Sequence, residues 1–414
     1  MLTPGRRLRT RVAGIVLFLP LLARVRFDQL VTQADYPGSR MVPATRALLS
    51  LLALQLLDQE RRSPIRDLNC DEALGLCAGL NILPKTTFAP DDSSRTQREH
   101  QHRLLAGWLT QIAPLLLPTA STFWLDLHPL PSRGDPTGLD AHSITQRGQA
   151  GTSVLTFVAH APDRRVLCYA NANLTRADQP GERMQFVEFW HAIAGHDPQW
   201  LYFDSKLVPY AALSRVNPRG IWFVTMRRRG AALFRRLPAL PPTAWRRTVI
   251  AIPTRRHQHV RYVDETTTLR GYTGAIRQVA VDGLGHPHPP LFVSNNFDAS
   301  ARDLITRDTG RNGVEESLGI SVHCFHLHCL ASEVRLNVDV DVALTGLAHG
   351  GYRWLATQLH GFDKAKPKQL SRKFVETGGQ LAIQADRIVV RFDKRAHHPI
   401  LREAALDKAC PPLP

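Results

Sequence analysis

The pattern of hydrophobic and polar residues changes near residue 120. Before that point apolar residues rich in Leu and Ala form helical runs, such as residues 45–57, which contain neither Gly nor Pro. Residues 71–77 begin another helix, which we expect to end at Gly79. Residues 91–102 are polar and indicate a linker. We therefore predict that the N-terminal part of the chain is helical.

A turn at residues 81–84 follows these helices and is followed by the basic start of residues 85–88. In a protein of this charge, such a turn is compatible with a helix-turn-helix that binds DNA. It is equally compatible with a packed helical hairpin, because helix-turn-helix geometry has few fixed residues. The sequence leaves both interpretations open.

Beyond residue 122, short apolar runs predict β-strands. Residues 123–127 are apolar and aromatic apart from one acid, and Pro129 and Pro131 bound this run. The elements predicted after it are a strand at 153–160, a strand at 165–171, an amphipathic helix at 183–194, and strands at 200–204 and 220–226. Three strands, a helix, a strand, a short helix and a strand are the order of a ribonuclease-H-like α/β core.

A β-rich insertion delays the last helix of this core. Apolar runs at 248–253, 259–263 and 275–281 predict strands in the insertion, and residues 291–294 resume the core. Residues 379–392 predict a β-hairpin that turns at 385–386. The expected parts are a helical domain (1–115), the first part of the core (116–228), the insertion (229–290), the end of the core with its last helix (291–350) and a basic C-terminal region (351–414).

Charge changes this picture. The chain of 414 residues is long enough for about two or three domains, and Lys and Arg outnumber Asp and Glu by 52 to 36. A formal charge of +16 favours a polyanionic partner such as nucleic acid. The longest apolar runs are shorter or more interrupted than the ~20 residues of a membrane span, so we predict no membrane partner. Six cysteines without a paired framework indicate reduced thiols and a cytoplasmic protein.

Arginine is concentrated in residues 207–263, a segment with twelve arginines, interleaved aromatic residues and no Asp or Glu. An ordinary solvated surface mixes charges of both signs. We therefore interpret this segment as a track for the phosphate backbone of DNA, whose binding should weaken steeply with salt. The members expected to contact DNA are Arg227, Arg228, Arg229, Arg255 and Arg256.

Two acids occupy unusual places in the predicted strands. Asp126 lies in the middle of an apolar strand, where a carboxylate is costly to bury unless it is paired or coordinates a cation. Asp204 ends the fourth strand, which would neighbour the first in such a sheet. Glu315, on the predicted closing helix, could reach the same edge. Three carboxylates around an open site suit two Mg²⁺ or Mn²⁺ ions rather than zinc, and such ions can drive phosphodiester chemistry.

Alternatives exist for each of these residues. Arg311 and Glu315 lie four apart on a helix, so on their own they could form a surface ion pair. Glu316 is adjacent to Glu315, while Asp135 and Asp140 follow Asp126 in a Pro- and Gly-rich loop that favours solvation.

The run His323-Cys324-Phe325-His326-Leu327-His328-Cys329 suggests zinc at first sight. It lacks the spacings of structural zinc sites, however, and consecutive ligands on one helix would point in different directions. We interpret this run as a helix that packs through Cys324, Phe325 and Leu327.

The order strand-Asp, strand-Asp, β-rich insertion, helix-Glu resembles that of the DDE transposases of bacterial insertion sequences. The resemblance covers roughly residues 10–410, and its most specific pieces are residues 123–129, 203–206 and 291–296 leading into 311–315. In this family a β-insertion interrupts a ribonuclease-H-like core.

The resemblance implies roles for individual residues. Asp126, Asp204 and Glu315 would be the catalytic metal ligands, Arg311 would contact phosphate, and Lys206 is a lesser candidate for DNA contact. The N-terminal helices would bind the terminal repeats. The family also carries a Tyr-x2-Arg-x3-Glu-x6-Lys signature on its last helix.

Two positions depart from that signature. Asp308 stands in the place of the Tyr and Val322 in the place of the Lys, and in the family both of these side chains contact the DNA end. The departure leaves open a catalytically inactive descendant that binds DNA ends as a repressor. A metal-dependent nuclease that cuts without joining is a further alternative.

The expectation from the resemblance is a transposase that cleaves DNA and transfers strands of its own insertion sequence. Its partners would be double-stranded DNA, as terminal inverted repeats and as target. Recognition of ends in pairs implies a homodimer on DNA, in the bacterial cytoplasm and associated with the nucleoid.

Overall fold

The structure is a computed structural model, and it describes most of the chain in separate ranges. These are residues 6–38, 42–58, 68, 71–77, 97–131, 141–144, 149–172, 174–175, 177–204, 210–227, 230–250, 258–309, 335–384 and 387–406.

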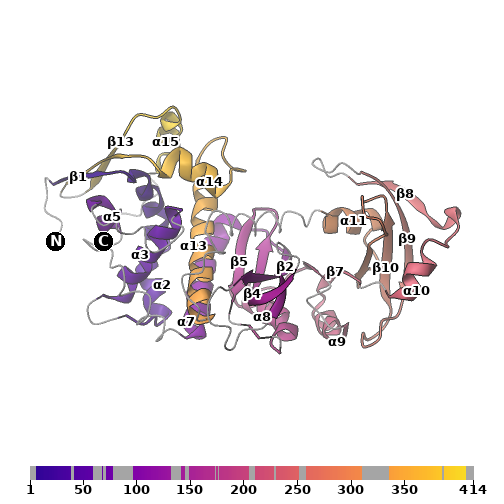
Figure 1. The fold of residues 1–414 in the computed structure, drawn as a ribbon. Coiled ribbons are helices and arrows are strands. Elements are labelled where there is room, and N and C mark those ends of the chain that lie inside the picture. The colour runs from indigo at the N-terminus through magenta and orange to yellow at the C-terminus, as the bar shows by residue number, and fades with distance from the viewer. Residues whose placement is uncertain are drawn as a thin grey trace.

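A helical layer forms one end of the molecule (Figure 1). Its helices are α1 (Leu19–Arg24), α2 (Phe27–Gln33), α3 (Ala44–Leu56), α5 (Glu72–Cys77), α7 (Arg98–Leu116) and α13 (Arg335–Gln358). The helices predicted at 45–57 and 71–77 are confirmed by α3 and α5. The long α13 packs against both α3 and α7, so a segment from late in the sequence completes the N-terminal helical layer.

The predicted linker at 91–102 was wrong at its C-terminal end. Helix α7 already begins at Arg98, where His100 Nδ1 accepts a hydrogen bond from the backbone N–H of Gln97 at 3.0 Å. Both His100 and Gln101 are buried. Polar residues at a helix start satisfy backbone groups that have no partner within the helix, so polarity here marked a cap and not a linker.

The prediction that residues 1–115 are only helical was also wrong. Strand β1 (Arg7–Thr10) pairs antiparallel with β12 (Gly379–Ile383), which pairs with β13 (Ile388–Phe392). The predicted C-terminal hairpin is thus confirmed, and β1 adds a third strand to it. Around this sheet lie a 3₁₀ helix (Ala13–Phe18), α14 (Pro367–Leu370), a π-helical turn (Ser371–Val375) and α15 (His398–Ala404).

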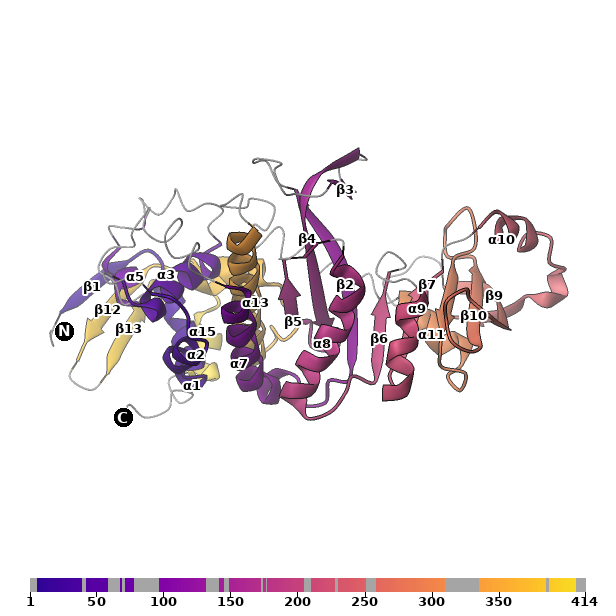
Figure 2. The same cartoon turned by 90° about the horizontal axis from the view of Figure 1, so that it is seen from below.

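A large mixed sheet fills the rest of the molecule (Figure 2). Its strands are β2 (Thr122–Pro131), β3 (Ala141–Ile144), β4 (Gln149–Ala161), β5 (Val166–Asn171), β6 (Trp200–Phe203), β7 (Trp222–Met226), β8 (Arg246–Val249), β9 (His259–Thr267), β10 (Ile276–Asp282) and β11 (Leu291–Ser294). Along the sheet the order is β3-β4-β2-β6-β7-β11-β10-β9-β8, and β5 pairs with β4 beside this path. Every core and insertion strand predicted from the sequence is present.

Strand directions divide the large sheet into two kinds of pairing. Strands β2, β6 and β7 run parallel, and β4 lies antiparallel to β2 and to β5. From β7 through β11, β10, β9 and β8 every pairing is antiparallel. The insertion strands therefore extend the core sheet instead of forming a second sheet.

The prediction that Pro129 and Pro131 bound the first strand was wrong. Strand β2 continues through both prolines, paired with β4 as far as Pro131. Its other neighbour, β6, pairs only with Thr122 to Leu125. Beyond Leu125 no described residue pairs with β2 on its β6 side, and a residue without an N–H costs no ladder hydrogen bond there.

Helices cover both faces of the large sheet. On one face α7 and α8 (Gln179–Ala194) pack against Phe123, Leu201 and Phe203 in the largest buried cluster. On the other face α13 contributes Val338 and Val342, which pack with Val158 and Ala170. Helix α11 (Ala301–Thr309) covers the same face near Trp200 and Tyr202. The short helices α9 (Tyr210–Leu213) and α10 (Ala231–Arg236) and the 3₁₀ turns Ser214–Arg219 and Pro242–Ala244 connect the strands.

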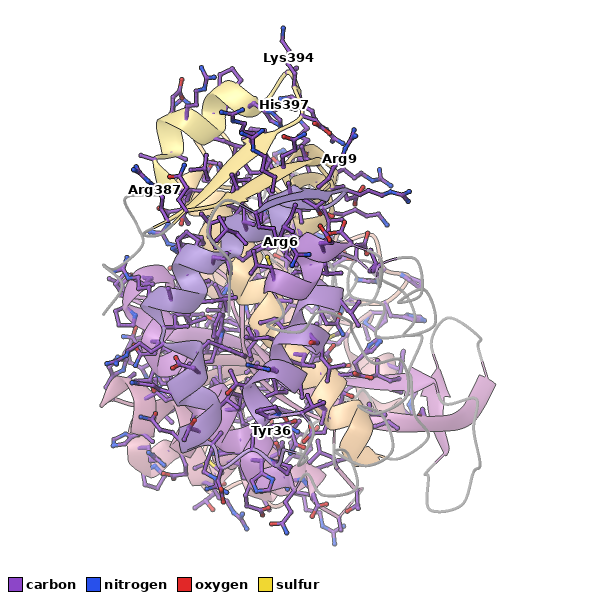
Figure 3. The ribbon with its side chains drawn as sticks, turned by 90° about the vertical axis from the view of Figure 1, so that its left-hand side faces the viewer. Arg6, Arg9, Tyr36, Arg387, Lys394 and His397 are labelled. Atoms are coloured by element: carbon purple, nitrogen blue, oxygen red, sulfur yellow. The ribbon has the colours of Figure 1, made fainter. Side chains whose placement is uncertain are left out.

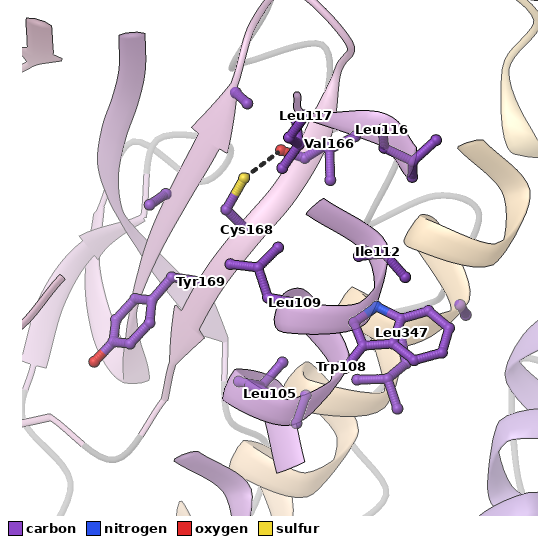
Figure 4. Close-up of a cluster of buried hydrophobic side chains, with 14 of the residues drawn as sticks. Leu105, Trp108, Leu109, Ile112, Leu116, Leu117, Val166, Cys168, Tyr169 and Leu347 are labelled. Atoms are coloured by element: carbon purple, nitrogen blue, oxygen red, sulfur yellow. Dashed lines mark hydrogen bonds between the residues drawn. The ribbon is translucent and has the colours of Figure 1, made fainter. Parts of the chain in front are cut away.

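Figure 4 shows the core between α7 and β5. Leu109 of α7 lies toward Cys168 of β5, whereas Ile112 lies on the side of α7 that faces α13, and Cys168 donates a hydrogen bond to the Val166 carbonyl at 3.4 Å. Burial raises the pKa of the Cys168 thiol to about 12. Cys77 and Cys168, the cysteines in the described ranges, are both free thiols. Within those ranges, no helix is both long and apolar enough to pass through a bilayer.

Helix α8 is fixed to β5 through Glu182, whose side chain has no exposed area. Tyr169 Oη and Asn171 Nδ2 each donate to Glu182 Oε1 at 2.7 Å. Burial raises the pKa of Glu182, although these two hydrogen bonds and the Arg98 charge act in the opposite direction.

A Tyr169→Phe variant should therefore be less stable by about 1.5–3 kcal/mol, because it removes a hydrogen bond to a buried charged group. Tyr36→Phe is the matched control, since Tyr36 Oη accepts a neutral hydrogen bond from Gln101 Nε2. That variant should lose only about 0.5–1.5 kcal/mol. Urea unfolding of both variants measures the difference, and equal losses would show that Glu182 carries no charge in the fold.

Candidate functional site

Asp126 lies in the middle of β2, and Asp204 directly follows the parallel strand β6. Trp124 of β2 is in register with Tyr202 of β6, and Leu125 with Phe203. The pairing ends there, and Asp126 and Asp204 are the next residue of each chain segment. Neighbouring strands are ~4.8 Å apart, so the two carboxylates can serve one site.

Both acids belong to the face of the sheet that α13 and α11 cover. Asp126 has the same parity as Trp124 and is in register with Val158, which packs on α13. Both carboxylates are half-buried, and the backbone N–H of Leu127 donates to Asp126 Oδ1 at 2.9 Å. Both carboxylates are therefore partly exposed to solvent, while apolar side chains on the same face of the sheet pack against α11 and α13.

The helices that flank this face approach from two sides. On the β6 side the Arg307 guanidinium of α11 lies 5.3 Å from the Trp200 ring centroid. On the β4 side Val338 and Val342 belong to α13. The chain that connects these two helices, residues 310–334, lies outside the described residues. Predictions that fall on it are Arg311, Glu315, the rival Glu316, the position of Val322 and the His-Cys run at 323–329.

Asp339 of α13 and His128 of β2 are further titratable groups that the sequence reasoning overlooked. Asp339 Oδ1 of α13 accepts a hydrogen bond from the backbone N–H of Ala172 at 2.8 Å, just after the end of β5. Burial raises the pKa of Asp339 to about 6. Burial also lowers the pKa of His128, which follows Asp126 on the same face of β2. The sequence could have indicated His128 through its position two residues after Asp126, because residues two apart in a strand lie on the same face of the sheet.

The donors that the two aspartates offer are carboxylate oxygens. Such hard ligands fit Mg²⁺ or Mn²⁺ and do not select zinc. In the described part of the chain, no group of three or more His, Cys, Asp or Glu residues is placed to hold a metal ion. The structure describes two residues of the predicted set, Asp126 and Asp204, and their role as metal ligands stays a prediction, as does that of Glu315.

The arginine-rich segment is less uniformly positive than its sequence suggests. Three of its arginines pair with acids from outside the segment. Arg219 binds Asp197 through Nε at 2.7 Å and also pairs with Glu188, Arg236 pairs with Glu265, and Arg261 pairs with Asp282. The Arg219 hydrogen bonds lower the pKa of Asp197. Antiparallel pairing thus brings Glu265 of β9 and Asp282 of β10 beside Arg236 and Arg261, while the interpretation of the segment as a DNA-binding track stays a prediction.

Among the DNA-contact candidates, Arg227 lies in the described residues. It follows β7, and its Nη1 donates to Gln278 Oε1, a neutral partner that leaves its charge uncompensated. Gln278 in turn donates to Glu265 at 2.6 Å. The other candidates lie outside the described residues: Lys206, Arg228, Arg229, Arg255, Arg256 and Arg311. The same holds for Asp135 and Asp140.

Comparison with protein-family models and with curated proteins found no relative of this protein. No protein-family model matches the sequence, and no curated protein is significantly similar to it.

Proposed function

We propose that the protein is a DDE transposase that cleaves DNA and transfers strands of its own insertion sequence. The observation that supports the proposal is that Asp126 and Asp204 directly follow Leu125 and Phe203, the last residues paired between the parallel strands β2 and β6. A carboxylate in an apolar strand is costly to bury unless it is paired or coordinates a cation, and a divalent cation between the two aspartates would meet that requirement.

The strand arrangement supports a ribonuclease-H-like core. From β5 the order runs β4, β2, β6 and β7, so the first and fourth predicted strands are neighbours. The second strand is antiparallel, while the first, fourth and fifth are parallel. Antiparallel strands β8 to β11 then continue the sheet, in agreement with a β-rich insertion before the closing helix.

The proposed chemistry divides between protein and metal. Asp126, Asp204 and the predicted ligand Glu315 would hold two Mg²⁺ or Mn²⁺ ions. When bound, such ions make a water or a 3′-hydroxyl a better nucleophile and stabilise the leaving oxygen of a phosphodiester. Asp126 within β2 and Asp204 directly after β6 would hold the ions, because strands fix the positions of such residues more rigidly than long loops would. Arg227, whose charge is not neutralised by Gln278, would contact phosphate from the opposite face of the sheet, on which Gln278 lies.

Metal dependence and product type test the proposal. The substrate is a duplex that carries the inverted repeat flanking the coding region, incubated with purified protein. We expect cleavage at the repeat and joining of its 3′-end to target DNA with Mg²⁺ or Mn²⁺, and neither product after chelation. Cleavage without joining would identify a nuclease. Binding of the repeat without any cleavage would identify an inactive descendant, the candidate favoured by Asp308 and Val322.

A further inference from the structure

Strands β1, β12 and β13 form a small sheet, here called the terminal sheet, with two unlike faces. Its inner face carries Leu8, Leu381 and Ile383, which pack with Ala13 in a buried cluster. Side chains alternate across a strand, so the residues between these point outward. The outward residues are Arg7 and Arg9 of β1, Gln380 and Ala382 of β12, and Val389 and Arg391 of β13.

Basic residues on the outward face are arranged both along strand β1 and across the sheet. Arg9 is in register with Gln380, which is in register with Arg391, so one row across the sheet reads Arg-Gln-Arg. Arg7 lies two residues from Arg9 on the same strand and is likewise exposed. None of the six outward positions is acidic. Figure 3 views this end of the molecule, with Arg9, Arg387 and Lys394 around the sheet.

These arginines have no internal role among the described residues. Arg7, Arg9 and Arg391 make no hydrogen bond or ion pair to another described side chain or backbone group. Their neighbours differ: Arg6 binds Glu72 at 2.9 Å, and Arg395 donates to the Arg372 carbonyl at 2.8 Å. Three unpaired guanidinium groups on a rigid sheet are available to an external anion.

The spacing of these charges suits a duplex. Residues two apart on a strand are separated by ~6.8 Å, and positions two strands apart by ~9.6 Å. Both distances fit within the ~12 Å width of a DNA major groove, so one duplex can present phosphates to all three arginines. An anionic membrane fits less well, because proteins that bind lipid surfaces place a large apolar face beside the basic one. Here only Ala382 and Val389 are apolar, and both are half-buried.

We infer that the outward face of the terminal sheet binds the phosphate backbone of double-stranded DNA. The inference rests on the proposed function and deepens it, since it places a DNA contact on a sheet built from both ends of the chain. It assigns to the terminal sheet the contact that the resemblance assigns to the N-terminal helices.

Salt dependence of DNA binding tests this inference in the full-length protein. The variant Arg7→Gln/Arg9→Gln/Arg391→Gln removes the three charges, and fluorescence anisotropy with a labelled duplex measures affinity from about 50 to 200 mM salt. Each lost phosphate contact lowers the slope of log K against log salt by ~0.9, so we expect a decrease of about 2.7. Affinity at ~0.1 M salt should fall by about tenfold or more.

The matched control is Arg24→Gln/Arg46→Gln/Arg103→Gln, which removes the same charge from exposed positions on α1, α3 and α7. This control should retain the wild-type slope. If the helical variant loses the slope and the sheet variant keeps it, or if both lose it equally, the inference is overturned. Circular dichroism checks that both variants fold, which exposed substitutions should permit.

Two further measurements separate this inference from its foundation. Loss of phosphatidylglycerol-vesicle binding in the sheet variant, with DNA binding unchanged, would assign the face to lipid and overturn it. Metal-dependent cleavage by a sheet variant with an unaltered salt slope would overturn the inference alone. Conversely, a reduced slope in a protein that never cleaves DNA would support the terminal sheet while the transposase proposal fails.

Discussion

An Asp204→Asn variant is expected to lose DNA cleavage by at least about a hundredfold while it still binds duplex DNA. Asparagine keeps the size of the side chain but removes the negative charge that a divalent cation needs. Even residues that only orient a metal ligand contribute about 10- to 100-fold, so a ligand itself should contribute more. Asp126→Asn should have an equal effect, because Asp126 and Asp204 directly follow the last residues paired between β2 and β6.

Asp163→Asn is the matched control for both substitutions. Asp163 is an exposed acid in the turn between β4 and β5, at the other edge of the sheet, so its loss should leave cleavage unchanged. Mn²⁺ binding, followed by calorimetry, should weaken in the two site variants and not in the control. Full cleavage by Asp204→Asn would end the assignment, and loss of DNA binding in that variant would point to a structural role.

The second large effect expected is a loss of stability in acid that originates in a buried histidine pair. His160 of β4 and His349 of α13 have ring centroids 6.4 Å apart, and Trp124 stacks on His160 at 6.3 Å. Burial lowers the pKa of each histidine to about 3, and for His349 the charge of His160 acts in the same direction. Arg353 adds a further positive charge near both rings.

The sign follows from comparison of the folded and unfolded chains. Below pH ~6.5 the histidines bind protons in the unfolded chain but not in the folded chain. The free energy of unfolding therefore falls by up to ~1.4 kcal/mol per pH unit for each ring. The loss continues until the pH approaches the folded pKa of about 3. Asp339 opposes it between pH ~6 and ~4, because its raised pKa lets the folded chain hold one proton more than the unfolded chain there.

Urea unfolding at a series of pH values from about 8 to 4 measures this dependence. A His160→Phe/His349→Phe variant should show a shallower loss of stability below pH ~6.5, whatever its stability at neutral pH. His360→Gln, at an exposed position, should keep the wild-type slope. A double variant with an unchanged slope would show that other groups cause the acid sensitivity.

The sequence predicted those parts of the fold where local pattern and tertiary packing agree. Local sequence shows the apolar runs of β2 and β6 and the acid in or directly after each run. These features were enough to select Asp126 and Asp204 as candidate site residues. Strand β1 could not, because its Arg-Leu-Arg-Thr pattern is too short to indicate a strand without its partner β12. Whether such a short segment forms a strand depends on its pairing with a strand that is distant in the sequence.

The arginine-rich segment illustrates the same limit for electrostatics. Counting charges along residues 207–263 missed Glu265 and Asp282, which lie beyond the segment in sequence but beside Arg236 and Arg261 in the sheet. The buried Asp339 was missed for a similar reason, since its partner is the backbone of Ala172. The net charge of a surface can be predicted only when the strand topology is known, because the fold brings together charges that are distant in the sequence.

The pairing of Arg7 with Ala382 also sets the order of events during synthesis. A ribosome adds roughly 5–20 residues per second, so β1 leaves the exit tunnel tens of seconds before β12 exists. Until then the three-stranded sheet cannot form, and prematurely terminated chains never form it. A nascent or truncated polypeptide would thus lack the Arg-Gln-Arg row, and the finished chain alone would be able to compete for DNA through that surface.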